Sequence, residues 1–156
     1  YTGISVGWMW TPEPTPCREN TLHANHIHHI LNILSDGGGI YSLGLQPGSR
    51  ISANLIHDVK VNAGRAESNG MFLDQGTGEM TIEENVIYGI DRSPLRFHKG
   101  WKNLVRNNVL AVAEGIPPVR YNDTVEERIR LEDNHVVPTV PKEVIDTARR
   151  RVGPRP

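Results

Sequence analysis

One short pattern of apolar and polar residues recurs five times along the chain. Each copy reads apolar, two variable residues, Asn, one variable residue, apolar, and each is too short to be a helix. The apolar positions are mostly β-branched residues or Leu, which favour strands. The pattern therefore predicts pairs of short strands that meet at a bend, in residues 22–27, 51–56, 82–87, 105–110 and 131–136.

The asparagines of this pattern are predicted to be structural. They stand at positions 25, 54, 85, 108 and 134, so the repeat length varies from 23 to 31 residues. A variable period suits a solenoid whose loops absorb the differences. Asn tolerates the left-handed backbone angles of a sharp bend. Stacked bends would place successive Asn amides about 4.8 Å apart, close enough for a hydrogen-bonded ladder.

A second predicted strand precedes three of these asparagines at a shared offset. Residues 39–44, 70–76 and 93–98 each begin fifteen residues before the asparagine. The longer repeats place their extra residues in 32–38 and 61–69, where we expect loops that carry a site on a rigid scaffold. We predict an all-β fold, a right-handed parallel β-helix of about five rungs spanning residues 1–137.

The end of the chain, residues 138–156, changes character. A polar, amphipathic segment begins at Pro141 and is followed by Gly153, with three arginines at 149–151. These are the features of a short helix with cations in its last turn. We expect this helix and tail to cover the last rung, because the open end of a solenoid invites edge pairing.

Charge and composition narrow the classes of partner. The chain has 17 basic and 18 acidic residues and a formal net charge of −1, which argues against a nucleic-acid-binding surface. No apolar run approaches membrane-spanning length, so no membrane partner is expected. The single Cys17 excludes an internal disulfide and a cysteine-based zinc site. The start of the chain at Tyr1, without Met or a recognisable signal peptide, is interpreted as that of a fragment or processed chain.

Aromatic residues give the first candidates for sugar binding. Trp8 and Trp10 share one face of a predicted strand, and either form an outward stacking platform or fill the core. Tyr41 and Phe72 have outward parity on their strands, as does Asp74. Arg96 is expected to be a solvated strand charge.

Histidines offer a rival interpretation. His23, His26, His28 and His29 are dense and, with His98, supply imidazoles for a metal. However, the repeat aligns His28, His57 and Tyr88 in one column. This alignment favours a stacked ladder or substrate contacts, and we expect no metal ion.

Six segments carry a recognisable combination of motifs: residues 3–10, 25–30, 34–44, 46–49, 56–59 and 70–76. They resemble a bacterial family of right-handed parallel β-helix proteins that includes the fucosidases and xylanases of glycoside hydrolase family 141. The resemblance covers residues 1–137. Family members are far longer, so the resemblance implies a C-terminal portion preceded by further rungs. It also implies a secreted or periplasmic protein, an oligo- or polysaccharide substrate and no cofactor.

The resemblance further implies a pair of catalytic carboxylates. Asp36 matches the acid of the family's Leu-Ser-Asp-x-Gly-Gly loop, and Asp74 matches the acid of its Leu-Asp strand. Members often read Asp-Glu-Gly where this chain has Gln75 after Asp74. Substrate contacts are expected from Trp8, Trp10, His28, Tyr41, His57, Phe72, Gln75 and His98.

Geometry limits this pair. Glycoside hydrolysis needs two carboxyl groups about 5 Å apart for retention, or roughly 6.5–9.5 Å for inversion. The repeat aligns Asp36 with Glu67, seven positions before Asp74, so the two acids meet only if the glycine loop 37–39 folds back. His98 falls in the column of Gln75, near Asp74.

Two alternatives remain open. A non-catalytic β-helix piece would bind glycans or serve a structural role. A polysaccharide lyase or epimerase would need a base beside calcium-binding acids, and no such Asp cluster occurs.

Overall fold

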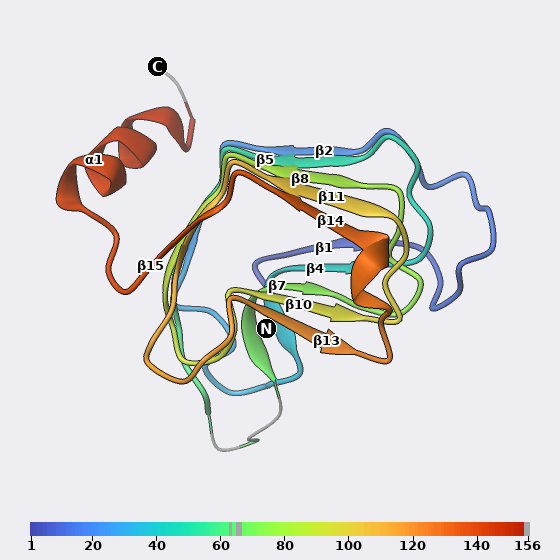
Figure 1. The fold of residues 1–156 in the computed structure, drawn as a ribbon, viewed down its shortest axis with the longest axis horizontal. Coiled ribbons are helices and arrows are strands. Elements are labelled where there is room, and N and C mark those ends of the chain that lie inside the picture. Colours follow the sequence, from blue (N-terminus) through green and yellow to red (C-terminus); the bar gives the residue numbers. More distant parts are fainter. Residues whose placement is uncertain (63, 65–66, 155–156) are drawn as a thin grey trace.

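The computed structural model describes residues 1–62, 64 and 67–154 (Figure 1). Its elements are short strands, a 3-10 turn between β13 and β14 (η1, Glu126–Arg128) and a helix after the last strand (α1, Lys142–Arg151). The strands are β1 (Ile4–Gly7), β2 (Thr21–His23), β3 (His26–His28), β4 (Gly37–Leu43), β5 (Arg50–Ser52), β6 (Leu55–Val59), β7 (Ser68–Leu73), β8 (Thr81–Glu83), β9 (Val86–Ile90), β10 (Leu95–His98), β11 (Asn103–Arg106), β12 (Val109–Ala111), β13 (Val119–Asn122), β14 (Ile129–Glu132) and β15 (His135–Val137).

The strands form three parallel sheets of five strands each. Sheet A has the order β1-β4-β7-β10-β13, sheet B β14-β11-β8-β5-β2 and sheet C β15-β12-β9-β6-β3. Every third strand along the chain thus returns to the same sheet, and successive turns stack on one another (Figure 1). This arrangement fits the predicted parallel β-helix of about five rungs. The right-handed winding stays a prediction.

The predicted asparagine ladder is confirmed. Each Asn Nδ2 donates to the Oδ1 of the next asparagine, at 2.8–2.9 Å from Asn25 through Asn134. The left-handed angle falls on the residue before each ladder asparagine, with φ between 48° and 56° at Ala24, Ala53, Glu84, Asn107 and Asp133. The asparagine therefore stabilises the bend through its side-chain hydrogen bonds, whereas the residue before it adopts the left-handed backbone angle.

The predicted alignment of the third repeat, which starts fifteen residues before Asn108, is wrong by one residue. Met71 pairs with Leu95, so Gly70 is equivalent to Pro94 and not to Ser93. The connection from Phe97 to Leu104 is one residue shorter than that between their partners in β7 and β8. The shortening places His98 directly after the Phe97–Leu73 pair, beside Asp74 rather than Gln75.

The interior is built from columns of aligned apolar side chains. Ile40, Met71 and Leu95 stack along sheet A, and equivalent columns fill sheets B and C. These residues are essentially inaccessible to solvent. Burial of such columns is the main favourable term that holds the rungs together.

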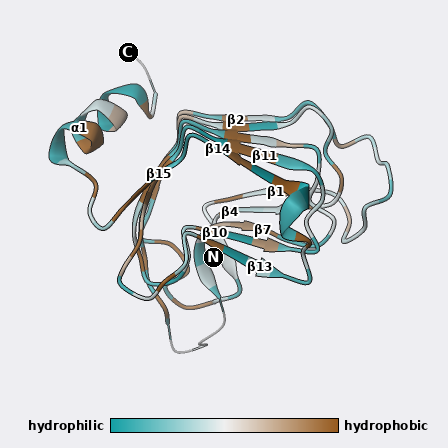
Figure 2. Ribbon diagram, in the orientation of Figure 1, coloured by the Kyte–Doolittle hydropathy of each residue, from teal (hydrophilic) through white to brown (hydrophobic). Residues whose placement is uncertain are grey.

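Helix α1 lies against the outer face of sheet C, and not over the last rung as predicted. Val144 and Ala148 join an apolar cluster with Leu55 and Val86, which point outward from sheet C. The end of the chain reaches back to the first rung, where Gly153 N donates to the Ala24 carbonyl at 2.9 Å. The helix takes this position because Leu55, Val86 and Ala111 make part of the outer side of sheet C hydrophobic. Figure 2 shows hydrophobic residues along the strands of this sheet and on part of α1. Such a face must be covered.

Within the described ranges, no helix is both long and apolar enough to cross a membrane.

Candidate active site

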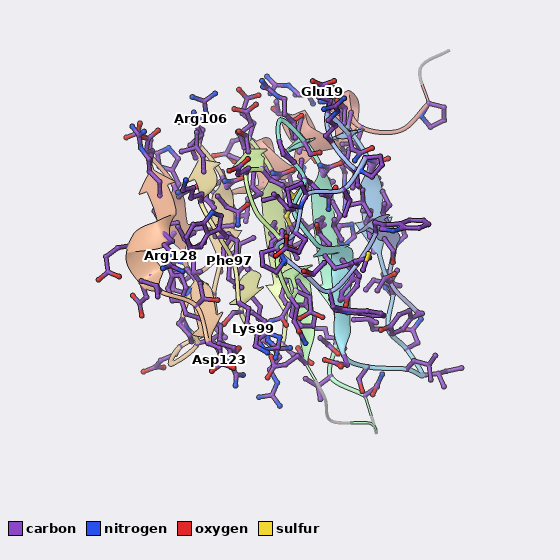
Figure 3. The ribbon with its side chains drawn as sticks, turned by 90° about the vertical axis from the view of Figure 1, so that its right-hand side faces the viewer. Glu19, Phe97, Lys99, Arg106, Asp123 and Arg128 are labelled. Atoms are coloured by element: carbon purple, nitrogen blue, oxygen red, sulfur yellow. The ribbon has the colours of Figure 1, made fainter. Side chains whose placement is uncertain are left out.

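The outer face of sheet A gathers most of the predicted site residues. Tyr41, Phe72, Arg96 and Arg120 occupy one register column across β4, β7, β10 and β13. His98 ends β10 and Asp74 directly follows β7, each two positions after the column residue of its strand and on the same side. In Figure 3, sheet A is at the bottom of the molecule, where Lys99 and Asp123 are labelled. Phe97 lies inside, and Arg106 points away from sheet B at the top.

Asp74 is the centre of a hydrogen-bonded network. Only 8% of the surface of Asp74 is exposed to solvent. The Tyr41 hydroxyl donates to Asp74 Oδ2 at 2.6 Å, and His98 Nδ1 lies 2.8 Å from Oδ1. Burial and then the hydrogen bond to Asp74 raise the pKa of Tyr41 above its ordinary value, so the phenol keeps its proton. Both carboxylate oxygens are thus held in place from two neighbouring rungs.

The long loop after β1 brings Trp10 to this network. Trp10 Nε1 donates to the Tyr41 hydroxyl at 3.1 Å. The loop comes this close because it passes over glycines: a Cβ at Gly76 would lie 2.5 Å from the Thr11 backbone, and one at Gly44 would lie 2.6 Å from the Met9 carbonyl. Both glycines have positive φ values, 77° and 74°. Their substitution would add strain as well as a clash.

Trp8 and Trp10 are 72% and 65% exposed, so the core interpretation is wrong. They lie in the loop that follows Gly7, beyond the end of β1, and not on a strand. Exposed indole faces beside a polar network are suited to stacking on sugar rings.

Asp36 lies at the start of β4, on the same face. Its neighbour Gly37 donates to the Glu67 carbonyl at 3.0 Å, as the predicted alignment of Asp36 with Glu67 requires. The Tyr1 hydroxyl donates to the Asp36 carbonyl at 2.8 Å. Burial first, then the charges of Asp36 and Asp74, raise the pKa of the Tyr1 phenol. The Tyr1 side chain therefore lies beside Asp36.

Arg96 is not the solvated charge that its sequence context suggests. Its side chain is 13% exposed, and Nη1 lies 3.6 Å from Asp36 Oδ1. The guanidinium sits 4.1 Å over the Phe72 ring, and Nε donates to Asn122 Oδ1 at 3.0 Å. Phe72 points outward as predicted but is only 2% exposed, because Arg96 and Tyr41 cover its ring. It supports Arg96 and has no free face for a sugar.

Sequence reasoning missed several polar residues of this face, among them Glu67, Asn122 and Asp123. Glu67 forms an ion pair with Arg120, Asn122 holds Arg96, and Asp123 Oδ2 lies 3.7 Å from His98 Nε2. The alignment of Asp36 with Glu67 was the one available signal for the first. The other two lie on β13 and after it, outside the fifteen-residue pattern, so no repeat pointed to them.

Two of the predicted substrate contacts lie on another sheet. His28, His57 and Tyr88 form the expected ladder on sheet C, with ring centroids 5.0 and 4.8 Å apart and nearly parallel planes. They are not brought together with Asp74. Gln75 stays in the sheet A loop beside Asp74 and accepts a hydrogen bond from Gly44 N through its backbone carbonyl.

The histidines of sheet C approach one another closely. His26 Nε2 lies 2.8 Å from His57 Nε2, and His57 Nδ1 lies 2.7 Å from Asp58 Oδ2. Nevertheless, in the described part of the chain no group of three or more His, Cys, Asp or Glu side chains is arranged to hold a metal ion.

Comparisons with known proteins give one structural likeness. No family model matches the chain, and no curated protein matches it. One solved structure, named as a glycoside hydrolase, is similar over 95% of this chain at 23% identity and a TM-score of 0.48. The chain spans 20% of the length of that structure.

Proposed function

We propose that this chain carries the catalytic face of a glycoside hydrolase that acts on a plant or microbial polysaccharide. The observation that supports this proposal best is Asp74, a nearly buried carboxylate fixed by Tyr41 and His98 on a face flanked by exposed Trp side chains. Cleavage of a glycosidic bond usually uses carboxylates held in fixed positions, and exposed indole rings can stack on a sugar.

The two proposed carboxylates have different surroundings and different tasks. Asp74 accepts hydrogen bonds at both oxygens, which suits an ionised group that activates water or attacks the anomeric carbon. Asp36 is more open and lies beside Arg96. As the second carboxylate, it would balance the positive charge that develops on the sugar ring in the transition state.

The resemblance to glycoside hydrolase family 141 and a secreted or periplasmic location belong to the same proposal. The motifs that carry the resemblance include both acids.

Replacement of Asp74 by Asn tests the proposal. In the full-length protein, Asp74→Asn should lower kcat at least about 1,000-fold, because an amide cannot act as base or nucleophile. Asp146→Asn on α1 is the matched control and should keep full activity. The measurement is reducing-sugar release from a panel of plant and algal polysaccharides. Near-wild-type turnover by Asp74→Asn would contradict the proposal.

A non-catalytic glycan-binding module is the second candidate, favoured by the exposure of Trp8 and Trp10. It predicts glycan-array binding that is lost on replacement of the two tryptophans by Ala and kept in Asp74→Asn, with no product formed by the wild type.

A further inference from the structure

Neither of the two proposed carboxylates is arranged as a proton donor. Departure of a sugar alcohol requires a proton on the glycosidic oxygen. Asp74 accepts hydrogen bonds at both oxygens, and Asp36 lies beside a guanidinium. Tyr41 is no substitute, because its hydroxyl already donates to Asp74 and its pKa is raised. A donor must therefore come from another group on this face.

His98 is placed to fill this gap. Its Nδ1 is bonded to Asp74 at 2.8 Å, which fixes the plane of the imidazole ring. Its Nε2 lies 3.7 Å from Asp123 Oδ2, too far for a hydrogen bond, so this nitrogen is not committed to that acid. The side chain is 21% exposed, which leaves an edge open to a ligand on the outer face of sheet A.

Two acids flank the His98 ring. Asp74 faces Nδ1 of the ring, and Asp123 lies on the side of Nε2. A carboxylate at Nδ1 that orients a histidine for proton transfer from Nε2 is a recurring arrangement in catalysis.

We infer that His98 is the general acid of the proposed hydrolysis, an assignment that rests on the proposed function. The Nε2 proton passes to the glycosidic oxygen as the bond between this oxygen and the anomeric carbon breaks, and the bonding electron pair stays with the departing oxygen. A water molecule supplies hydroxide to the anomeric carbon, directly or after a glycosyl-enzyme intermediate. The proton of this water goes to a carboxylate or to His98, and exchange with solvent restores the starting state.

The decisive variant is His98→Asn. The Asn amide can still donate to Asp74 from a position close to that of Nδ1, but it has no proton to transfer at the position of Nε2. His98→Gln is the second variant, for use if His98→Asn fails to fold, and His135→Asn on sheet C is the matched control. Thermal unfolding confirms that each variant is folded.

The test compares leaving groups. The probes are methyl and 2,4-dinitrophenyl glycosides of fucose, xylose, galactose and glucuronic acid. A dinitrophenolate departs without a proton, so His98→Asn should lose about 100- to 10,000-fold in kcat on the methyl glycoside and less than about 10-fold on the dinitrophenyl glycoside. Asp74→Asn should lose activity on both.

The outcomes distinguish failure of the His98 assignment from failure of the proposed hydrolase function. Equal losses on both leaving groups, or no loss on either, would overturn the assignment of His98 and leave the hydrolase proposal standing. A wild-type protein that cleaves none of the eight probes and no polysaccharide of the panel would overturn the proposed function, and the assignment with it.

Discussion

Each inner asparagine of the ladder satisfies several buried hydrogen-bonding groups at once. Asn85 Nδ2 donates to Asn108 Oδ1 and to the Ile51 carbonyl, and Asn85 Oδ1 accepts from Asn54 N and Nδ2. The residue is fully buried. Removal of its amide leaves partners on both neighbouring rungs without a hydrogen bond, and water has no access to replace it.

Asn85→Ala should lower the free energy of unfolding by about 2–4 kcal/mol, since buried partners are left unpaired and a small cavity forms. Asn25→Ala, at the half-buried first position, should lower it by only about 1 kcal/mol. Urea denaturation monitored by circular dichroism measures both values. Equal losses would mean that burial does not set the strength of the ladder.

Gly76 and Gly115 form a matched pair for a second prediction. Both have φ of 77°, but a Cβ at Gly115 meets nothing within 4 Å. Gly115→Ala should therefore show only the backbone cost of about 1 kcal/mol. Gly76→Ala should add a clash with Thr11, displace Trp10 from Tyr41 and lower activity about tenfold or more. Crystal structures and glycosidase assays distinguish the two, and an unmoved Trp10 would contradict this view of the loop.

Helix α1 depends on sheet C more than on its own sequence. A ten-residue helix is marginal in isolation, and its apolar contacts are Val144, Ile145 and Ala148 against the outward residues of sheet C. The position of the helix is therefore decided by the apolar side chains that the solenoid leaves uncovered.

Val144→Asp should detach the helix, because a carboxylate would be placed against Val86 and Val109. The expected loss is about 1–3 kcal/mol, with faster hydrogen exchange in residues 142–151. Lys142→Gln, at the exposed start of α1, is the control and should exchange like the wild type. Unchanged exchange in Val144→Asp would show that the helix is held elsewhere.

The elements differ in how far they were predictable. The ladder residues, the stacked strands and the existence of α1 follow from periodic apolar positions and from Asn chemistry, both of which are local. The position of His98 was predicted one residue off, because a one-residue shortening of a turn leaves no mark in the repeat itself. The burial of the Phe72 ring and the position of α1 depend on side chains from other rungs that pack against them. These contacts are known only once the fold is known, so the sequence pattern could not predict them.

At the scale of the whole molecule, histidines in the first two rungs of sheet C interact electrostatically with the C-terminal segment. Burial lowers the pKa of His26 and of His57, and the charges of His28 and Arg149 lower both further. Asp58 acts in the opposite direction on His57 without cancelling the effect of burial.

This coupling predicts lower stability in acid. Below about pH 6.5 the unfolded chain binds more protons at these histidines than the folded one, so the free energy of unfolding falls as pH falls and levels off above about pH 7. Urea denaturation between pH 5 and 8 measures it. His57→Gln should flatten the pH dependence relative to the wild type, whereas His135→Gln should not. Parallel curves for His57→Gln and the wild type would contradict the coupling.

The ladder also gives the solenoid a direction. The bonds between ladder asparagines all run from Nδ2 of one residue to Oδ1 of the next toward the C-terminus, so Asn25 presents an amide oxygen at one end and Asn134 Oδ1 accepts at the other. A further rung that stacked before Asn25 would have to bring a donor to this corner, and one that stacked after Asn134 would have to bring an acceptor. Aligned amide dipoles make the two ends chemically unequal, and the stack therefore selects the polarity of whatever extends it.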